Sequence, residues 1–245
     1  MAATLLELEG LLAHVEVVAR PSTVWGSAVA GRVGETAVIV QAFGLGKANT
    51  AAGLTAALLA WRPAAVLQVG IGGAYLGSFL SIGMVAAATE DVDLDLGVRS
   101  ADGWRDLSTM GFPLTPATGG RRERSNAVPT HAGLVTALGR VAEVVPVRFA
   151  TLDAITGDVD AGAELARRHD VAIESMEGVA AAQVCDRLGV PFAEVRGVSN
   201  VVGERDRARW NLRTSTRASC DAARALLRRW NDLEETKALA HAPRW

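Results

Sequence analysis

A long stretch of almost uncharged sequence constrains the fold of this chain more than any other feature. Between residues 48 and 89 the only charged side chain is Arg62. Such a segment can be covered on all sides, as the centre of a largely parallel sheet requires. Its first part, 48–61, is rich in Ala and Leu and predicts a helix that Pro63 ends, and 65–69 predicts a buried strand.

This stretch does not predict a membrane span. A spanning helix needs about 20 mainly apolar residues, whereas glycines and polar side chains divide 63–89 into two short apolar runs. The pattern therefore predicts a strand, a glycine loop and a second strand. Residues 1–20 also lack the basic start and the small-residue cleavage site of a signal peptide. We expect a cytoplasmic protein with no membrane partner.

Composition and charge favour a small molecule as the partner. The chain has 245 residues, of which 49% are hydrophobic and 21% charged, as in a compact domain. Its net charge is -2, so no basic field would attract nucleic acid. Two cysteines and four scattered histidines offer neither metal-ligand spacing nor a disulfide framework. We expect no metal and no cofactor.

Strand and helix signals alternate along the rest of the chain. Strands are predicted at 24–30, 36–41, 144–149 and 192–198, and helices at 160–169, 176–188 and 210–230. This alternation predicts a single α/β domain over residues 1–245, with α/β/α layers around a mixed central sheet.

Two segments show neither the helical nor the strand spacing of apolar residues. Residues 96–129 turn polar and predict a long loop or flap. Residues 231–245 predict a frayed tail.

Two glycine motifs resemble nucleotide-binding loops but lack residues that the consensus sequences of these loops require. The segment 44–47, Gly-Leu-Gly-Lys, lacks the earlier glycine and the following Ser or Thr of a phosphate loop. The segment 70–73, Gly-Ile-Gly-Gly, lacks the third glycine of a dinucleotide fingerprint, because Tyr75 stands there. A simpler interpretation is that Gly72 and Gly73 let backbone amides approach a flat ligand. A tight glycine-rich turn without a ligand is the alternative.

Together, separated segments of this chain resemble the nucleoside phosphorylase and nucleosidase superfamily, and most closely its futalosine hydrolases. The segments are 44–47, Val-Gly-Ile-Gly-Gly-Ala-Tyr at 69–75, Glu-Ser-Met-Glu-Gly at 174–178, and Arg-Gly-Val-Ser-Asn at 196–200 followed by Val-Gly-Glu-Arg-Asp at 202–206. Each glycine piece alone is weak, but their order and spacing are specific. The resemblance implies a nucleoside phosphorylase-like fold and a homo-oligomer.

The resemblance assigns a ribose clamp to Met176 and Glu177. In the family the glutamate accepts hydrogen bonds from the sugar hydroxyls, and the methionine packs on the sugar face. Glu177 lies just inside the predicted helix 176–188, whose positive end favours an ionised carboxylate, so we expect it to stay charged. A carboxylate there also stabilises the positive charge that grows on the sugar in the transition state. The alternatives are a helix-capping acid for Glu177 and a core filler for Met176.

Asn200 is the residue from which we predict which purine base is released. It follows the predicted strand 192–198, where a sheet offers residues to a ligand, and Ser199 beside it is a further candidate substrate contact. Adenine-directed nucleosidases of the superfamily usually carry aspartate here. An amide can accept a hydrogen bond from a protonated purine N7 and donate to a 6-oxo oxygen, which favours hypoxanthine or guanine. The alternative for Asn200 is a turn former. Asp206 is a candidate substitute acid, with a surface ion pair as its alternative.

Glu7 falls where the family's water-activating glutamate stands, counting from Ala3 and Thr4. The family begins with a full strand before this point, whereas here only residues 1–3 precede the loop. We therefore expect either a mis-assigned start or a truncated first strand, and if the strand is absent we expect Glu7 to be less well fixed. An exposed position on an amphipathic helix is the alternative.

The segment 153–157 resembles the loop that covers the purine, with Ile155 and Thr156 as candidate contacts. A plain connecting loop is the alternative.

The implied reaction is hydrolysis of futalosine to release hypoxanthine, in menaquinone biosynthesis. A cation should meet the benzoate-like tail of this substrate, and Arg99, Arg105 and the run 121–124 are candidates. The other functions that stay open are a 5'-methylthioadenosine/S-adenosylhomocysteine nucleosidase, a purine nucleoside phosphorylase in which Lys47 imitates part of a phosphate site, and a catalytically silent nucleoside-binding protein.

Overall fold

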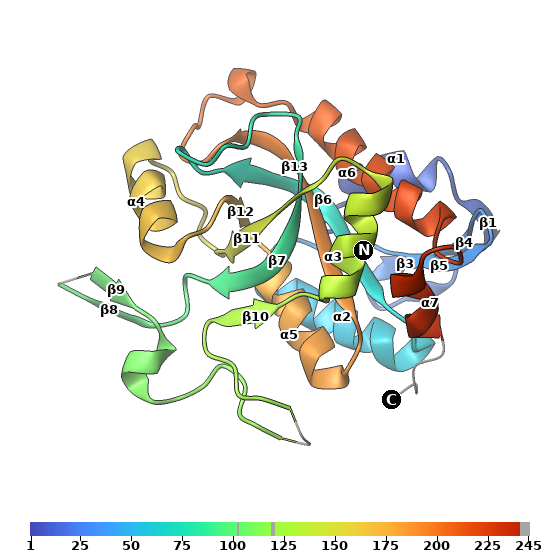
Figure 1. The fold of residues 1–245 in the computed structure, drawn as a ribbon, viewed down its shortest axis with the longest axis horizontal. Helices are drawn as coiled ribbons and strands as arrows, with labels where there is room; N and C mark the ends of the chain where they lie inside the picture. Colours follow the sequence, from blue (N-terminus) through green and yellow to red (C-terminus); the bar gives the residue numbers. More distant parts are fainter. Residues whose placement is uncertain (102, 119–120, 241–245) are drawn as a thin grey trace.

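A computed structural model describes residues 1–101, 103–118 and 121–240 (Figure 1). The α-helices are α1 (Leu5–Leu12), α2 (Lys47–Trp61), α3 (Ala132–Val141), α4 (Val159–His169), α5 (Gly178–Leu188), α6 (Leu212–Arg228) and α7 (Glu234–Ala240). The central strands are β6 (Val66–Ala74), β7 (Val85–Asp93), β10 (Ala127–Pro129), β11 (Val145–Thr151), β12 (Ile173–Ser175) and β13 (Phe192–Val201). The outer elements are β1 (Glu16–Ala19), β2 (Ser22–Thr23), β3 (Gly26–Ser27), β4 (Val29–Val33), β5 (Thr36–Val40), β8 (Val98–Ser100), β9 (Gly103–Arg105) and the short 3₁₀ helices η1 (Leu107–Met110) and η2 (Arg207–Arg209).

The central sheet is mixed and curls back on itself. Its strand order is β10-β7-β11-β12-β6-β13, with an additional pairing of β7 to β13. Strands β6 and β13 run parallel, and β13 meets β7 antiparallel. Ala87 on β7 therefore has Pro146 of β11 on one side and Val195 of β13 on the other. This closure brings β6, β7 and β13 together.

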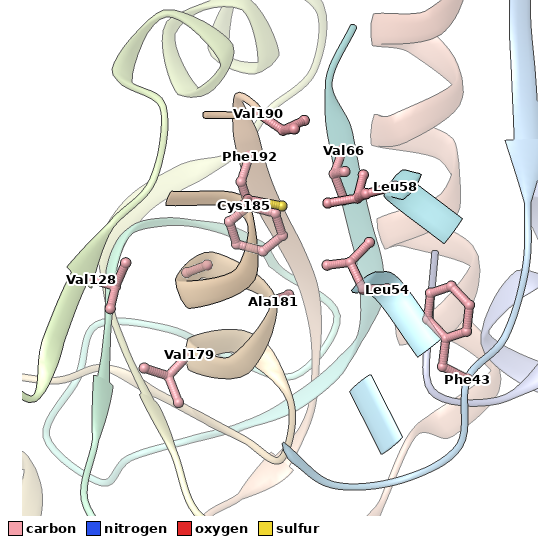
Figure 2. Packing of buried hydrophobic residues seen from close by; sticks show 11 residues of the cluster. Phe43, Leu54, Leu58, Val66, Val128, Val179, Ala181, Cys185, Val190 and Phe192 are labelled. Atoms are coloured by element: carbon pink, nitrogen blue, oxygen red, sulfur yellow. The ribbon is translucent and has the colours of Figure 1, made fainter. Parts of the chain in front are cut away.

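Helices cover both faces of the sheet. On one face, α2 and α5 bury a cluster against β6 and β13, and Figure 2 shows Leu54 and Leu58 of α2 facing Val66 and Phe192 of these strands. On the other face α3 and α6 pack side chains such as Leu138 against the sheet, with α1 beside α6 (Figure 1). The predicted α/β/α layers with a mixed central sheet are confirmed.

Residues 1–3 join the central sheet to an outer sheet of order β1-β4-β5. The Met1 amino group donates to the Leu67 carbonyl at 2.7 Å, and the Met1 carbonyl accepts from the Val69 amide at 2.9 Å. Ala2 pairs in parallel with Ala42, just after β5. Beside this bridge lies an apolar groove of about 390 Å³ between β5 and β6.

Three predicted segments need correction. The strand predicted at 24–30 is divided, because Gly26 turns the chain with a φ of 93° and β4 begins only at Val29. The flap predicted at 96–129 contains β10, whose Val128 is fully buried in the core. The frayed tail predicted at 231–245 contains α7, because Leu233 and Leu239 pack against α3, while 241–245 lie outside the described residues.

Within the described ranges, the structure contains no helix of the length and apolar character that crossing a membrane requires.

Candidate active site

A buried arginine connects two of the predicted catalytic residues. Arg196 lies on β13 and is 1% exposed. Its Nη2 donates to Glu177 Oε2 at 3.0 Å, and its Nη1 lies 3.7 Å from Glu7 Oε1. Its Nη1 also donates to the Ile71 carbonyl at 3.1 Å, which fixes the guanidinium against β6. The structure thus brings Glu7 and Glu177 to the same cation.

Glu7 is fixed at the start of α1. It forms a capping box with Thr4, in which Thr4 Oγ1 accepts from the Glu7 amide at 3.3 Å and Glu7 Oε2 accepts from the Thr4 amide at 3.0 Å. Its other oxygen, Oε1, accepts from the Ile71 amide at 3.1 Å. Glu7 is 6% exposed. The alternative of an exposed helix position is wrong, and so is the expectation of a poorly fixed Glu7, because the cap and β6 hold the carboxylate.

Glu177 occupies the N-cap position of α5, one residue before the helix, without a side-chain capping bond. Its Oε1 accepts from the Gly46 amide at 3.1 Å, and its Oε2 faces Arg196. Burial raises the pKa of Glu177, and the Arg196 charge and the Gly46 hydrogen bond oppose that rise. Because Glu177 makes no side-chain capping bond, the helix-capping alternative is wrong. Burial, and not the helix end, has the largest influence on the pKa of this carboxyl group. Met176 lies beside Glu177 and is partly buried.

Gly70 leaves the space in which the carboxylate and the arginine meet. A Cβ built on Gly70 would lie 2.5 Å from Glu7 Oε1 and 2.6 Å from Arg196 Nη1. Both distances are shorter than a Cβ atom can approach another heavy atom, so a side chain here would displace these groups.

Gly70→Ala should therefore lower kcat/KM by about 100-fold, the cost of misplacing reacting groups by about 1 Å. We expect the variant to lose about 1–3 kcal/mol of stability through overpacking. Gly139→Ala on the exposed face of α3 is the matched control, since nothing lies within 4 Å of its Cβ position. The control should gain about 0.5–1 kcal/mol because alanine favours a helix. Steady-state kinetics and thermal unfolding of both variants check this, and an active Gly70→Ala enzyme would contradict the close packing.

Gly72 and Gly73 lie inside β6, which continues to Ala74. The tight-turn alternative is therefore wrong. A Cβ on Gly72 would lie 2.7 Å from Ile173 Cγ2, and one on Gly73 would lie 2.9 Å from Val202 Cγ2. Both glycines thus allow close packing of the neighbouring segments around the end of β6.

Asn200 lies within β13, which ends at Val201, and the turn begins only at Val202, so the turn-former alternative is wrong. It is 8% exposed. Ser199 Oγ lies 2.7 Å from Asn200 Oδ1 and 3.2 Å from the Gly72 carbonyl oxygen. Asn200 Nδ2 donates to the Val201 carbonyl at 2.8 Å. These contacts orient the amide and leave a lone pair on Oδ1 and a hydrogen on Nδ2 for a ligand.

The loop 152–158 is tied to the sheet by Glu174. Glu174 Oε1 accepts from the Thr156 amide at 2.8 Å, and Glu174 Oε2 accepts from Thr156 Oγ1 at 2.6 Å and from the Tyr75 hydroxyl at 2.9 Å. Ile155 is 39% exposed at the surface of this loop. Thr156 thus holds the loop in place, while Ile155 is the side chain of the predicted pair that remains open to a ligand.

Asp206 lies at the surface. Its Oδ1 accepts from the Ala208 amide at 3.0 Å, and its Oδ2 lies 3.8 Å from Arg209 Nε. This arrangement agrees with the surface ion-pair alternative rather than with a substitute acid.

Lys47, at the start of α2, is surrounded by aspartates. Its Nζ lies 3.0 Å from Asp93, 3.2 Å from Asp95 and 3.7 Å from Asp153. Burial alone would lower the pKa of Lys47, but hydrogen bonds and charges from Asp93 and Asp95 raise it above its ordinary value. The positive charge of Lys47 is thus compensated by the surrounding aspartates.

Two of the arginines proposed for the substrate tail lie at the far end of α5. Arg124 Nη2 lies 2.9 Å from Asp186 Oδ1, and Arg121 packs on Gly189, where a Cβ would lie 2.3 Å from its Nη2. Glu177 stands at the opposite end of this helix, about 16 Å away along its axis. Arg121 and Arg124 therefore do not reach the Glu177 site of their own chain.

Sequence reasoning assigned no role to Arg196, although the motif contains it. A signal was available: Glu194 and Arg196 are charged residues two positions apart in an apolar run predicted as a buried strand. Alternate strand residues share a face, and buried charges occur in pairs or with a function.

The chain is similar to known proteins over most of its length. Residues 1–229 match the family model of the Phosphorylase superfamily. The futalosine hydrolase of Thermus thermophilus is 36% identical over 185 residues, which cover 75% of this chain and 78% of that protein. A 5'-methylthioadenosine/S-adenosylhomocysteine nucleosidase of Psychromonas ingrahamii is 29% identical over 183 residues, covering 71% of this chain and 73% of that protein.

Solved structures share the fold. The native structure of the futalosine hydrolase of Helicobacter pylori superposes with a TM-score of 0.78 at 21% identity, covering 92% of this chain and 94% of that one. Because the family model spans nearly all of the sequence, the chain belongs to the phosphorylase superfamily.

Proposed function

We propose that this chain hydrolyses the N-glycosidic bond of futalosine and releases hypoxanthine, as a step of menaquinone biosynthesis. The observation that carries the proposal is the oriented amide of Asn200, held by Ser199 and Val201 beside the end of β6. Similarity supports it, since the Thermus thermophilus protein that is 36% identical is a futalosine hydrolase. Nucleosidases named for adenine nucleosides match at lower identity.

In the proposed reaction, Glu7 accepts a proton from the attacking water. Its carboxylate is fixed by Thr4 and Ile71, which orients the base before substrate binds. Glu177 accepts hydrogen bonds from the ribose hydroxyls and stabilises the positive charge that develops on the sugar. Met176 packs on the sugar face.

Asn200 stabilises the departing base. Its Oδ1 accepts a hydrogen bond from the protonated N7, and its Nδ2 donates to the 6-oxo oxygen. An adenine would place its amino group against the same Nδ2, donor against donor, which disfavours that transition state. Ile155 covers the face of the base, and Thr156 keeps this loop closed on Glu174.

The surroundings of Lys47 favour water over phosphate as the nucleophile. A phosphate bound by Lys47 would meet Asp93, Asp95 and Asp153, which already neutralise this cation. Like charges at these distances repel, so Lys47 is a poor phosphate ligand.

We also propose a cytoplasmic homo-oligomer in which a neighbouring subunit completes the pocket for the substrate tail. Support comes from exposed apolar side chains close together in the sequence after β6: Leu76 is 53%, Phe79 70% and Ile82 42% exposed. Such a cluster is typical of a contact surface.

A substrate panel tests the function. The enzyme is incubated with futalosine, inosine and 5'-methylthioadenosine, with and without phosphate, and the free base is measured by chromatography. We expect hypoxanthine from futalosine at a rate independent of phosphate. Adenine release from methylthioadenosine, or a strict need for phosphate, would instead support one of the rival enzymes, and binding without cleavage of any nucleoside would support the silent binding protein.

A further inference from the structure

Behind the site, two buried carboxyl groups meet beside the first residue of α5. Asp91 on β7 and Glu194 on β13 are both fully buried. A Cβ built on Gly178 would lie 2.0 Å from Asp91 Oδ2 and 2.2 Å from Glu194 Oε2. Both oxygens therefore converge on the same point, and the glycine at the start of α5 leaves room for them.

The remaining oxygens of this pair have partners. Asp91 Oδ1 accepts from Thr151 Oγ1 at 2.6 Å, and Thr151 Oγ1 in turn accepts from the Val179 amide at 2.9 Å. Glu194 Oε1 accepts from Arg196 Nε at 2.6 Å. Asp91 Oδ2 and Glu194 Oε2, however, have no hydrogen-bond donor within the described part of the chain.

The charges around Arg196 do not balance. The carboxyl groups of Glu7, Glu177 and Glu194 lie within 3.7 Å of its nitrogens, and Asp91 lies behind Glu194. One guanidinium cannot compensate this many buried carboxylates, because an unpaired buried charge is strongly disfavoured. A proton between the two facing oxygens removes one negative charge and turns an acceptor–acceptor contact into a hydrogen bond.

We infer that Asp91 and Glu194 share one proton and act as positioning residues, which hold Arg196 in the orientation that serves Glu177 and Glu7. The pair then presents a single negative charge to the Nε side of the guanidinium. Its other nitrogens stay directed at the two catalytic carboxylates and at the Ile71 carbonyl. The positioning role rests on the proposed function, since that function gives Glu7 and Glu177 their tasks.

The environment of Asp91 supports the shared proton. Burial, followed by the charge of Glu194, raises the pKa of Asp91 well above its ordinary value, while Thr151 and Arg196 oppose the rise. Besides these groups, Tyr75, which follows β6 and donates to Glu174, is within electrostatic reach of Asp91, and Gln68 of β6 stands opposite Glu194 in the strand register.

Amide variants test the inference. In Asp91→Asn or Glu194→Gln, the new NH2 group supplies the hydrogen and the remaining carboxylate supplies the single charge. We expect each single variant to lower kcat/KM by less than about tenfold. The double variant removes the charge altogether, so it should lose about 100-fold or more, mainly in kcat, because Arg196 is misplaced. A loss greater than the product of the single losses is the signature of a pair.

Two readouts do not depend on activity. Infrared spectroscopy in heavy water should detect the carbonyl stretch of a protonated carboxylic acid in the wild type, and this band should disappear in each single variant. The second is the pH dependence of thermal unfolding. Because the folded state keeps a proton that the unfolded chain releases above the ordinary pKa of 3.8, the wild type loses stability as pH rises from there towards the raised pKa. Asp91→Asn should make that loss smaller, while the part that comes from Glu177, whose pKa is also raised, remains.

The outcomes of these experiments test the shared proton and the positioning role separately. A single variant as inactive as the double one, or a band that survives in both single variants, would overturn the shared proton. A fully active double variant would overturn the positioning role. If the double variant does not fold, the infrared band and the single variants still decide. If the band behaves as expected but futalosine is not cleaved, the shared proton stands and the proposed function fails.

Discussion

Glu177→Gln should lower kcat/KM for futalosine by about 100- to 1,000-fold, the usual effect of removing one preorganised group from a site of developing charge. The amide keeps the shape of the side chain but not the negative charge that faces the sugar. The loss should fall mainly on kcat, because the sugar is positively charged in the transition state and neutral in the ground state. Measuring hypoxanthine release over a range of futalosine concentrations separates kcat from KM.

The same variant should lose only about 1–3 kcal/mol of stability. The Gln oxygen can accept from Arg196 or from the Gly46 amide, and its NH2 group then faces the other donor. Glu164→Gln is the control, since Glu164 pairs with Arg167 and Arg168 at the surface of α4. It should leave kcat/KM unchanged. A Glu177→Gln enzyme that cleaves futalosine normally, or one that fails to fold, would assign Glu177 a structural role only.

Asn200→Asp should shift the preference of the enzyme from a 6-oxo to a 6-amino purine. The appropriate substrates are futalosine and its 6-amino analogue, which differ only at the group that Asn200 faces. A carboxyl group can serve N7 as an acid or acceptor and accepts from an amino group, but it no longer offers the donor for a 6-oxo oxygen. We expect the ratio of kcat/KM, amino over oxo, to rise by about 100-fold or more.

Asn231→Asp adds the same charge at an exposed position and serves as the control. It should leave the ratio unchanged. Competition of the two nucleosides in one reaction measures the ratio directly. An unchanged ratio in Asn200→Asp would show that the base is selected elsewhere, for example by the loop that carries Ile155.

Local signals in the sequence were sufficient for most of the fold. The helix predicted at 48–61 is α2, Lys47–Trp61, because alanine and leucine favour a helix and Pro63 cannot continue one. The strand predicted at 144–149 is β11, Val145–Thr151. Where the predictions were wrong, tertiary packing decided: α7 forms because Leu233 and Leu239 reach the α3 face, a contact that no local pattern contains.

The candidate site was only partly predictable, for the same reason. Family motifs pointed to Glu177 and Asn200, and both lie around the end of β6 and β13. The contact of Glu7 with Arg196, in contrast, depends on how α1 meets β6, and the contact of Asp91 with Glu194 depends on the antiparallel pairing of β7 with β13. Such contacts join residues far apart in the chain, and one sequence contains no information on register of this kind.

Helix α5 has a mechanical consequence for the molecule. Its last turn is attached to the segment 96–129 by the Arg124–Asp186 ion pair and by Arg187, which donates to the Pro116 carbonyl at 3.0 Å. A helix of this length is a stiff rod, so its two ends cannot shift independently. We therefore expect a displacement of the segment 96–129 to be transmitted along α5 to its first turn, beside which Glu177 lies.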